Sequence, residues 1–314
     1  MPKVFSVSER VLVLVAPPGE AAPLSLDLER DLADLAGRAP RVLAPGRAVE
    51  VPVPPARLEA ARDFVRERVL PLPLDWALLP AARRRKRLLV CDMDSTVITV
   101  ECVDELAERA GVRARVAAIT RRAMAGDLVF EEALAERVRL LAGLPLAEVD
   151  RVIRERVRLA AGARTLVATM RAHGAFCALV SGGFTEFTRV VRIAAGFDMD
   201  RANRLEVRLG RLTGRLLPPV LGRDAKRETL VELAAHLGLA AAETCAVGDG
   251  ANDMAMIEAA GLGVGFRPQA RVREVADAVI EHGDLTTLLY FQGFRAEEIV
   301  RPPPLRLALC GDDA

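Results

Sequence analysis

Residues 87–96, RLLVCDMDST, decide the fold of this 314-residue chain. The apolar run 88–91 is typical of a strand buried on both faces inside a parallel sheet. Asp92 and Asp94 follow it directly and should emerge at the strand's carboxyl end, where open α/β sheets bind ligands. Residues i and i+2 of an extended segment point the same way, so both acids could address one reacting atom and one cation. Capping of the next helix would explain one aspartate but not the pair.

Composition excludes several functional classes. Hydrophobic residues make up 51% and charged residues 28%, which suits a globular protein with a sizeable core in roughly two domains. The net charge of +1 gives no general attraction to nucleic acid or membrane. No apolar run approaches the ~18 residues of a membrane span, and the first ten residues lack a signal peptide's apolar region. We therefore expect a cytoplasmic protein without nucleic-acid or membrane partners, and a homodimer stays open.

Cysteine, lysine and asparagine are each informative here. The five cysteines show no CxxC spacing, and buried free thiols are predicted for Cys91, Cys177 and Cys245, which lie in apolar runs. Only three of the 44 basic residues are lysines, and the only asparagines are Asn203 and Asn252. Because arginine is used wherever it would serve, a lysine or asparagine within a motif carries more information than usual.

Residues 1–82 are predicted to form a small α+β domain. Strand-like and helix-like patterns alternate over 10–80 in the order βαββαβ, which is the ferredoxin-like pattern. At this size the segment resembles an ACT-type regulatory domain, although it contains no specific ligand motif. A packing or oligomerisation module is an equally good interpretation. The basic run 83–87 marks the boundary and is typical of a solvated linker.

Residues 83–300 are predicted to form an α/β core with a helical insertion at about 100–162, followed by a tail at 301–314. The insertion shows helical spacing broken by glycines, which predicts about four short helices directly after the acid-bearing turn, placed where they can act as a lid. The core resumes with a strand at 175–180, then SGG at 181–183 and a helix from Phe184. A hairpin around Gly210, a helix opened by Lys226 and a strand at 244–248 follow.

Three strand ends carry polar groups suited to one site. They are Asp92 with Asp94, the glycines after Ser181, and the GDGANDM segment at 248–254, with Lys226 as the cation among them. Carboxylates gathered at one point repel unless a cation lies between them, and their hard oxygen atoms favour Mg²⁺. A glycine turn at a helix N-terminus suits a phosphoryl group beside that ion.

The motifs DMDST, SGG, a lone lysine and GDGANDM, in this order, resemble the four motifs of the haloacid dehalogenase superfamily of phosphotransferases. The resemblance covers roughly residues 87–293. It is closest to the O-phosphoserine hydrolases of that superfamily, because Glu101 and the stretch 123–138 also match their substrate-facing segment. The resemblance implies a Rossmann-like parallel-sheet core with an inserted helical-bundle cap.

The same resemblance implies roles for individual residues. Asp92 would be the nucleophile and Asp94 the general acid and base. Asp92 and Asp249 would hold Mg²⁺ together with the backbone carbonyl of Asp94, and Asp253 would support the ion from nearby. The substrate-binding residues implied by the match are Ser181, Gly182, Lys226 and Asn252 for phosphate, Glu101 and Arg137 for the amino and carboxyl groups, and Met124 and Phe130 for the apolar wall.

The predicted function is Mg²⁺-dependent hydrolysis of O-phospho-L-serine to L-serine and phosphate through an aspartyl phosphate, the last step of L-serine biosynthesis. Another small-molecule phosphatase, or a phosphotransferase acting on homoserine, remains open. So does a catalytically silent amino-acid sensor. Without the family match, Arg137 would be assigned to a solvated helix face, and Glu101 to the favourable interaction of an acid with a helix N-terminus.

Overall fold

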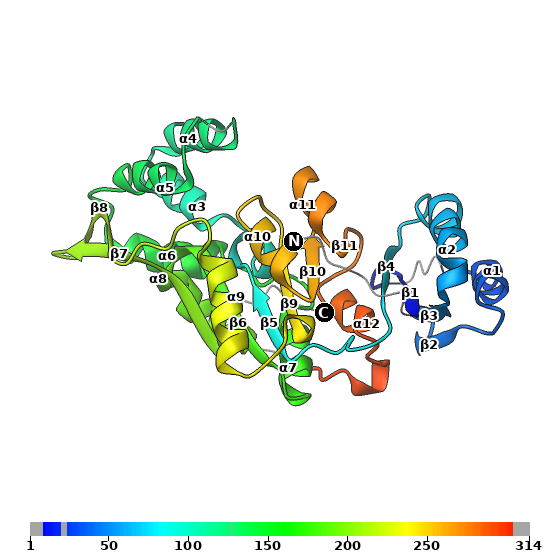
Figure 1. Ribbon diagram of the computed structural model, residues 1–314. Helices are drawn as coiled ribbons and strands as arrows, with labels where there is room; N and C mark the ends of the chain where they lie inside the picture. The colour runs from blue at the N-terminus through cyan, green and yellow to red at the C-terminus, as the bar shows by residue number, and fades with distance from the viewer. Residues whose placement is uncertain (1–8, 20–23, 126, 304–314) are drawn as a thin grey trace.

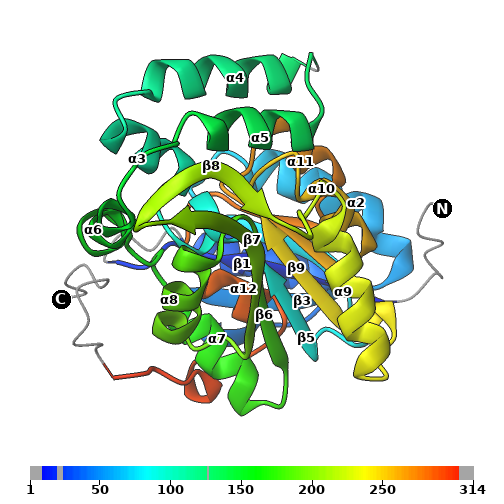
Figure 2. The same cartoon turned by 90° about the vertical axis from the view of Figure 1, so that its left-hand side faces the viewer.

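The structure is a computed structural model that describes residues 9–19, 24–125 and 127–303 (Figures 1 and 2). The N-terminal part has the predicted order of elements: β1 (Arg10–Val15), α1 (Leu26–Ala36), β2 (Arg41–Ala44), β3 (Ala48–Val53), α2 (Leu58–Phe64) and β4 (Asp75–Pro80). Its strands are antiparallel neighbours in the order β2-β3-β1-β4, the ferredoxin-like arrangement. The side chain of Ser25 caps α1, and Gly37 ends it with φ 71°. The ACT-type role stays a prediction.

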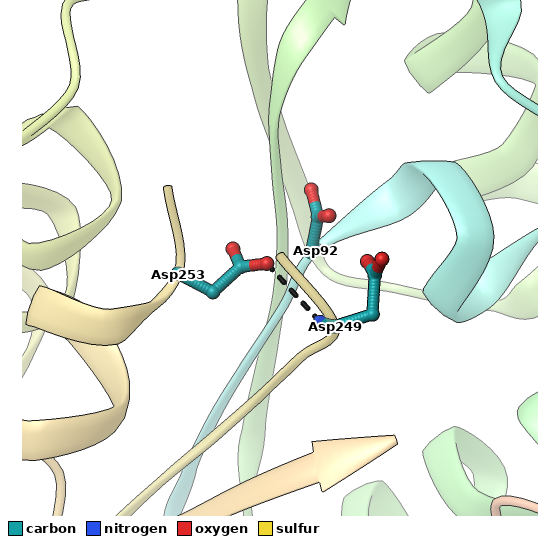
Figure 3. A group of neighbouring side chains, drawn as sticks. All are labelled: Asp92, Asp249 and Asp253. Atoms are coloured by element: carbon teal, nitrogen blue, oxygen red, sulfur yellow. Dashed lines mark hydrogen bonds between the residues drawn. The ribbon is translucent and has the colours of Figure 1, made fainter. Parts of the chain in front are cut away.

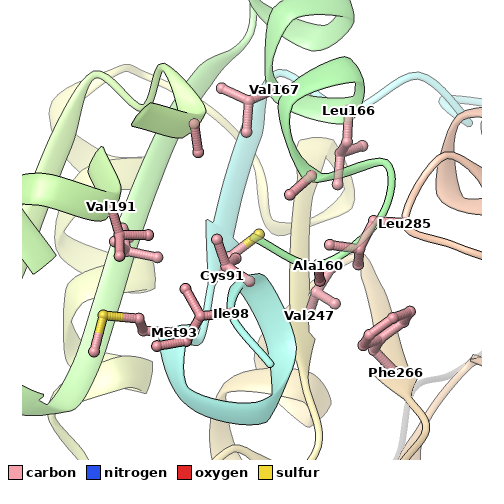
Figure 4. Packing of buried hydrophobic residues seen from close by; sticks show 14 of the residues in the cluster. Cys91, Met93, Ile98, Ala160, Leu166, Val167, Val191, Val247, Phe266 and Leu285 are labelled. Atoms are coloured by element: carbon pink, nitrogen blue, oxygen red, sulfur yellow. The ribbon is translucent and has the colours of Figure 1, made fainter. Parts of the chain in front are cut away.

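The core is a parallel sheet with helices on both faces. Its strands, in spatial order, are β11 (Ala278–Ile280), β10 (Leu262–Phe266), β9 (Thr244–Gly248), β5 (Leu88–Cys91), β6 (Phe176–Phe184) and β7 (Met199–Arg208). One face is covered by α7 (Ala163–Ala172), α8 (Thr185–Ala195) and α12 (Thr287–Phe291), the other by α9 (Ala225–His236), α10 (Met254–Ala259) and α11 (Ala270–Val275). All four residues of β5 are 0% exposed, as its apolar run predicts, and Figure 4 shows the packing around Cys91.

The predicted hairpin is present, and the predicted end of β6 is wrong. Strand β8 (Arg211–Leu217) pairs with β7 around a turn that contains Gly210. Strand β6 does not stop at residue 180 but continues through the SGG segment to Phe184, and α8 begins at Thr185. The β6–β7 register shifts between Val180 and Phe184, so the glycines belong to an irregular strand end rather than to a turn.

Four helices among the described residues form the inserted cap: α3 (Cys102–Arg109), α4 (Arg113–Ala125), α5 (Phe130–Arg139) and α6 (Leu146–Arg156). Figure 2 shows α4 and α5 above the sheet. Backbone hydrogen bonds join the α5–α6 connection to the hairpin, from Gly143 N–H to Leu212 C=O at 2.8 Å and from Leu146 N–H to Gly210 C=O at 2.9 Å. The cap is therefore fastened to the core at this end.

The N-terminal sheet continues into the core sheet. Trp76 of β4 pairs antiparallel with Val279 of β11, so the described strands form one 11-stranded sheet. One face of the N-terminal sheet packs on α1 and α2, and the other belongs to the same hydrophobic cluster as α12 of the core. The two parts that meet at the boundary predicted after residue 82 thus share one continuous sheet and one hydrophobic cluster.

Two further observations concern the cysteines and the helices. The free cysteines among the described residues, Cys91, Cys102, Cys177 and Cys245, are all buried, which confirms the predicted thiols. Within the described ranges, no helix is long and apolar enough to cross a membrane.

Candidate active site

The two aspartates after β5 lie in different surroundings. Asp92 N–H donates to the carbonyl of Val247 in the neighbouring β9 at 2.9 Å, which continues the sheet to the edge of the site. Asp94 Oδ1 accepts the backbone N–H of Cys102 at 3.1 Å, and Ser181 Oγ lies 3.4 Å from Asp94 Oδ2. Asp94 therefore binds the first backbone N–H of helix α3 and also faces the end of β6. The same residue thus stabilises a helix N-terminus and lies in the site.

Three carboxylates converge at the carboxyl ends of β5 and β9. Asp92, Asp249 and Asp253 each offer an oxygen atom within 4.8 Å of the others, and Figure 3 shows them approaching from two strand ends and the start of α10. The buried Lys226 Nζ lies 2.5 Å from Asp92 Oδ1 and 2.6 Å from Asp253 Oδ1. Three acids against this one ammonium group leave the cluster with surplus negative charge.

Asp253 uses both of its oxygen atoms within the protein. Oδ1 binds Lys226, and Oδ2 accepts the backbone N–H groups of Asp249 at 3.2 Å and Gly250 at 3.0 Å. A Cβ atom at Gly248 would lie 2.3 Å from the Asp253 carboxyl carbon, so this strand end requires glycine. Asp253 therefore orders the loop and the lysine, and its predicted support of a metal ion stays a prediction.

The electrostatics of the cluster follow from burial and like charge. Burial, then the negative charge of Asp253, raises the pKa of Asp92 well above its usual range, and Lys226 opposes this. Burial and Asp253 also raise the pKa of Asp249 to about 6, against a hydrogen bond from Thr96. Burial alone would lower the pKa of Lys226, but Asp253 and Asp92 raise it above its ordinary value. A divalent cation would relieve the same repulsion.

A small cavity beside Lys226 brings together residues from the sheet and the cap. Five predicted site residues line it, namely Phe130, Ser181, Gly182, Lys226 and Asn252, along with Val180, Leu221, Gly222, Arg223 and Ala225. The ring of Phe130 lies 3.0 Å from where a Cβ atom at Gly182 would be, so the cap closely approaches the end of β6. This cavity holds a cation, a hydroxyl group and an amide, which are groups that bind phosphate.

Glu101 lies at the start of one cap helix, and Arg137 lies on another, α5. Glu101 is the residue before α3, and its carboxylate accepts a hydrogen bond from Ser95 Oγ at 2.6 Å. Removal of water by the surrounding protein, then the charge of Asp94, raises the pKa of Glu101 to about 7. Partial burial lowers the pKa of Arg137, while the charges of Asp104 and Glu101 oppose this. The side chain of Met124 lies outside the described residues.

Sequence reasoning missed three polar side chains that position the site. Ser95 binds Glu101, and Thr96 Oγ1 donates to Asp249 Oδ1 at 3.1 Å. Asn203 is 0% exposed and bonds the carbonyl of Gly182. The two hydroxyl groups were visible in DMDST but had no assigned partner. The rarity of asparagine was the available signal for Asn203.

Comparison with known proteins is consistent with this geometry. The model of the haloacid dehalogenase-like hydrolases matches residues 89–258, and a phosphoserine phosphatase of Albidiferax ferrireducens is 40% identical over 80% of this chain and 97% of its own. The chain belongs to the haloacid dehalogenase-like hydrolase family. Within that family, a phosphoserine phosphatase of Streptomyces coelicolor is 42% identical over 81% of this chain and 62% of its own length. The chain thus spans less than two thirds of that relative.

A solved structure gives a further comparison inside the haloacid dehalogenase-like family. It is a phospho-aspartyl intermediate analogue of phosphoserine phosphatase, with a TM-score of 0.62 and 40% sequence identity, and the match covers 66% of this chain and 99% of that one. The family match includes the segments that carry Asp92, Ser181, Lys226 and Asp249.

Proposed function

We propose that the chain is a cytoplasmic, Mg²⁺-dependent phosphatase that hydrolyses O-phospho-L-serine at the last step of L-serine biosynthesis. The observation that carries this proposal is the convergence of Asp92, Lys226 and Asp249 beside a cavity that Phe130 of the cap also lines. The similarity to phosphoserine phosphatases that span most of this chain supports the substrate. A panel of phosphorylated metabolites tests it: we expect phosphoserine to give the highest kcat/KM, and a clear preference for a different ester would contradict it.

The residues of the chain divide the reaction into two displacements. Asp92 attacks phosphorus and forms an aspartyl phosphate, while Asp94 donates a proton to the departing serine oxygen. Asp94 then takes a proton from the water that attacks the aspartyl phosphate, which releases phosphate and restores Asp92. Lys226 and Ser181, with the backbone at Gly182 and the amide of Asn252, hold the phosphoryl oxygen atoms and stabilise their charge throughout.

The donor set fits Mg²⁺. Asp92 uses Oδ1 for Lys226 and Asp249 uses Oδ1 for Thr96, so each keeps its second oxygen for a ligand role, with the Asp94 carbonyl nearby in sequence. Burial, then the negative charge of Asp253, raises the pKa of both acids, and a bound cation would offset both effects. When bound, Mg²⁺ neutralises charge on the phosphoryl group and orients it.

Chelation gives the test of the metal. We expect EDTA to abolish turnover and Mg²⁺ to restore it, while Ca²⁺ inhibits because its larger, flexible coordination shell misplaces the nucleophile. Mg²⁺ should also raise the melting temperature of the chelated protein, and Asp249→Asn should remove that shift. Full activity in EDTA would contradict the assignment.

The cap residues are proposed to select the substrate. Glu101 would bind the ammonium group and Arg137 the carboxylate, with the Phe130 ring and Met124 as the apolar wall. Glu101→Gln and Arg137→Ala should lower kcat/KM for phosphoserine and hardly change that for an aryl phosphate without ammonium and carboxylate groups. Arg137→Lys should not rescue fully, because an ammonium group cannot grip a carboxylate with two parallel bonds. An equal loss on both esters would show a role in folding or chemistry instead.

Assays with and without homoserine separate hydrolysis from phosphoryl transfer.

A further inference from the structure

Asn203 is a buried asparagine that joins two segments of the chain. It lies on β7 and is 0% exposed. Its Nδ2 donates to the carbonyl of Gly182 at 2.9 Å, and its Oδ1 accepts the backbone N–H of Leu221 at 2.8 Å. Both ends of the carboxamide are therefore used, and each bond crosses to a different segment.

Both partners of Asn203 line the candidate phosphate cavity. Gly182 belongs to the irregular end of β6, and Leu221 belongs to the segment that leads into α9, the helix that carries Lys226. The carboxamide of Asn203 thus spans the two walls of the cavity. Its length fixes the separation between the strand end and the entry to α9.

The bond to Gly182 also orients the hydroxyl group of Ser181. A peptide unit is planar, so the direction of the Gly182 carbonyl sets the direction of the Gly183 N–H. That N–H donates to Ser181 Oγ at 2.8 Å. With Oγ engaged as an acceptor, the hydroxyl proton of Ser181 is available for a phosphate oxygen or for Asp94 Oδ2, which lies 3.4 Å away.

We infer that Asn203 is a positioning residue for the phosphate subsite, which holds the Gly182–Gly183 peptide against the entry to α9 and so aims the Ser181 hydroxyl group into the cavity. The reaction named in this inference rests on the proposed function. Phosphate binding in the cavity can be tested independently of it. Asn203 itself touches neither the reacting atoms nor Asp92. Its removal leaves the Gly182 carbonyl and the Leu221 N–H without their buried partner, so both segments are free to rearrange.

The test compares Asn203→Ala with a matched control elsewhere in the core. Gln292 is also a buried amide with both ends used, since Oε1 accepts Lys86 N–H at 2.9 Å and Nε2 donates to Leu288 C=O at 3.3 Å. For the full chain with Mg²⁺, we would measure the melting temperature, the Kd of inorganic phosphate by calorimetry, and kcat and KM for phosphoserine. Asn203→Ala should weaken phosphate binding about 10-fold and lower kcat about 10- to 100-fold. Gln292→Ala should lower the melting temperature and leave phosphate affinity and kcat unchanged.

The outcomes separate positioning from stability. If Asn203→Ala melts earlier but binds phosphate within about twofold of wild type, Asn203 only stabilises the core and the inference is overturned. If Asn203→Ala does not fold, the near-isosteric Asn203→Asp decides: it keeps the acceptor for Leu221 but loses the donor to Gly182, so unchanged phosphate affinity overturns the inference. Wild type that binds phosphate but does not hydrolyse phosphoserine would refute only the proposed function. Wild type that binds no phosphate would overturn the inference itself.

Discussion

Asp92 and Asp94 are two residues apart, yet their side chains have separate partners. Asp92 joins Lys226 within the acid cluster, whereas Asp94 turns towards the N-terminus of α3 and the hydroxyl group of Ser181. Burial raises the pKa of Asp94, and the hydrogen bond from Cys102 opposes this. Asp94 has a raised pKa and forms no ion pair with a lysine of the described residues, which suits proton transfer. Asp92 is paired with Lys226, which suits nucleophilic attack.

The two aspartates should therefore fail differently when changed. Asp92→Asn removes the proposed nucleophile, so no phosphoenzyme should be recovered after acid quenching with labelled substrate and turnover should cease. Asp94→Asn should lose mainly proton transfer, which is worth roughly 10²- to 10⁴-fold in kcat. Trapping of phosphate on Asp92→Asn would show that the roles are assigned wrongly.

Glu101 gives a pH prediction. Because its pKa is raised to about 7, it is largely neutral below that pH and anionic above it. Only the anion attracts the substrate ammonium group, so KM for phosphoserine should rise as the pH falls through about 7. The measurement is kcat/KM against pH for phosphoserine and for an aryl phosphate without an ammonium group.

The aryl phosphate shares the titration of the phosphate group, so the difference between the two profiles isolates Glu101. That difference should vanish in Glu101→Gln, which cannot ionise. Persistence of the same acidic limb in this variant would assign it to another group.

The residues in the motifs could be predicted because their types are tied to chemistry at fixed places in the chain. Asp92 and Asp249 needed only the rule that parallel strands end at one edge of a sheet. Lys226 lies on a helix, and the signal for it was the rarity of lysine in this chain. The bonds from Thr96 to Asp249 and from Asn203 to Gly182 could not be predicted, since they join residues 153 and 21 positions apart and depend on how β5, β9 and β7 are aligned.

At the scale of elements, the cap contacts the core near both ends of α5, in addition to the bond from Cys102 N–H to Asp94. The α5–α6 connection is bonded to the hairpin through Gly143 and Leu146. Near the first turn of α5, Glu131 Oε1 accepts the backbone N–H of Arg223 at 3.0 Å, and Phe130 packs over Gly182. The bond from Glu131 is exposed and ends at Arg223, which lines the cavity, so it can open while the bonds through Gly143 and Leu146 remain.

Glu131→Ala should therefore weaken closure of the cap rather than folding. The bond is exposed and worth about 0.5–1.5 kcal/mol, so we expect KM for phosphoserine to rise roughly two- to tenfold with little change in melting temperature. Glu131→Gln keeps an acceptor oxygen and should be close to wild type. The exposed neighbour Glu132 provides the control variant Glu132→Ala. Equal effects of the changes at 131 and 132 would argue against this contact.

The order of the helices and strands could be predicted from the sequence more accurately than the residues at which they end. Periodicity placed the four cap helices and the strand before Ser181, but it ended that strand at residue 180 because glycines usually mark turns. Its continuation to Phe184 depends on pairing with β7, which local sequence does not reveal. Helix α12, only five residues long, was also missed, since its apolar side chains are buried against both parts of the molecule.

At the scale of the whole molecule, a buried carboxylate joins the N-terminal sheet to the core. Asp75 begins β4, is 2% exposed, and accepts the backbone N–H groups of Glu281 at 2.8 Å, His282 at 3.0 Å and Gly283 at 2.8 Å. Arg47 adds an ion pair to Asp284 at 3.1 Å. None of these residues belongs to the acid cluster or lines the cavity, so they can be changed separately from the site.

Because the sheet and the cluster around α12 are continuous, the N-terminal part and the core should unfold together. Asp75→Asn leaves some of the three N–H groups without an acceptor, at about 1–3 kcal/mol for each unsatisfied group, and should lower the melting temperature by several degrees while kcat/KM stays unchanged. The lone tryptophan, Trp76, pairs with β11 and reports on this junction by fluorescence, whereas far-ultraviolet circular dichroism reports on the whole chain. The two transitions should coincide in wild type. Asp27→Asn, at an exposed ion pair on α1, is the control and should change little. A fluorescence transition well below the dichroism transition would show instead that the N-terminal part unfolds independently of the core.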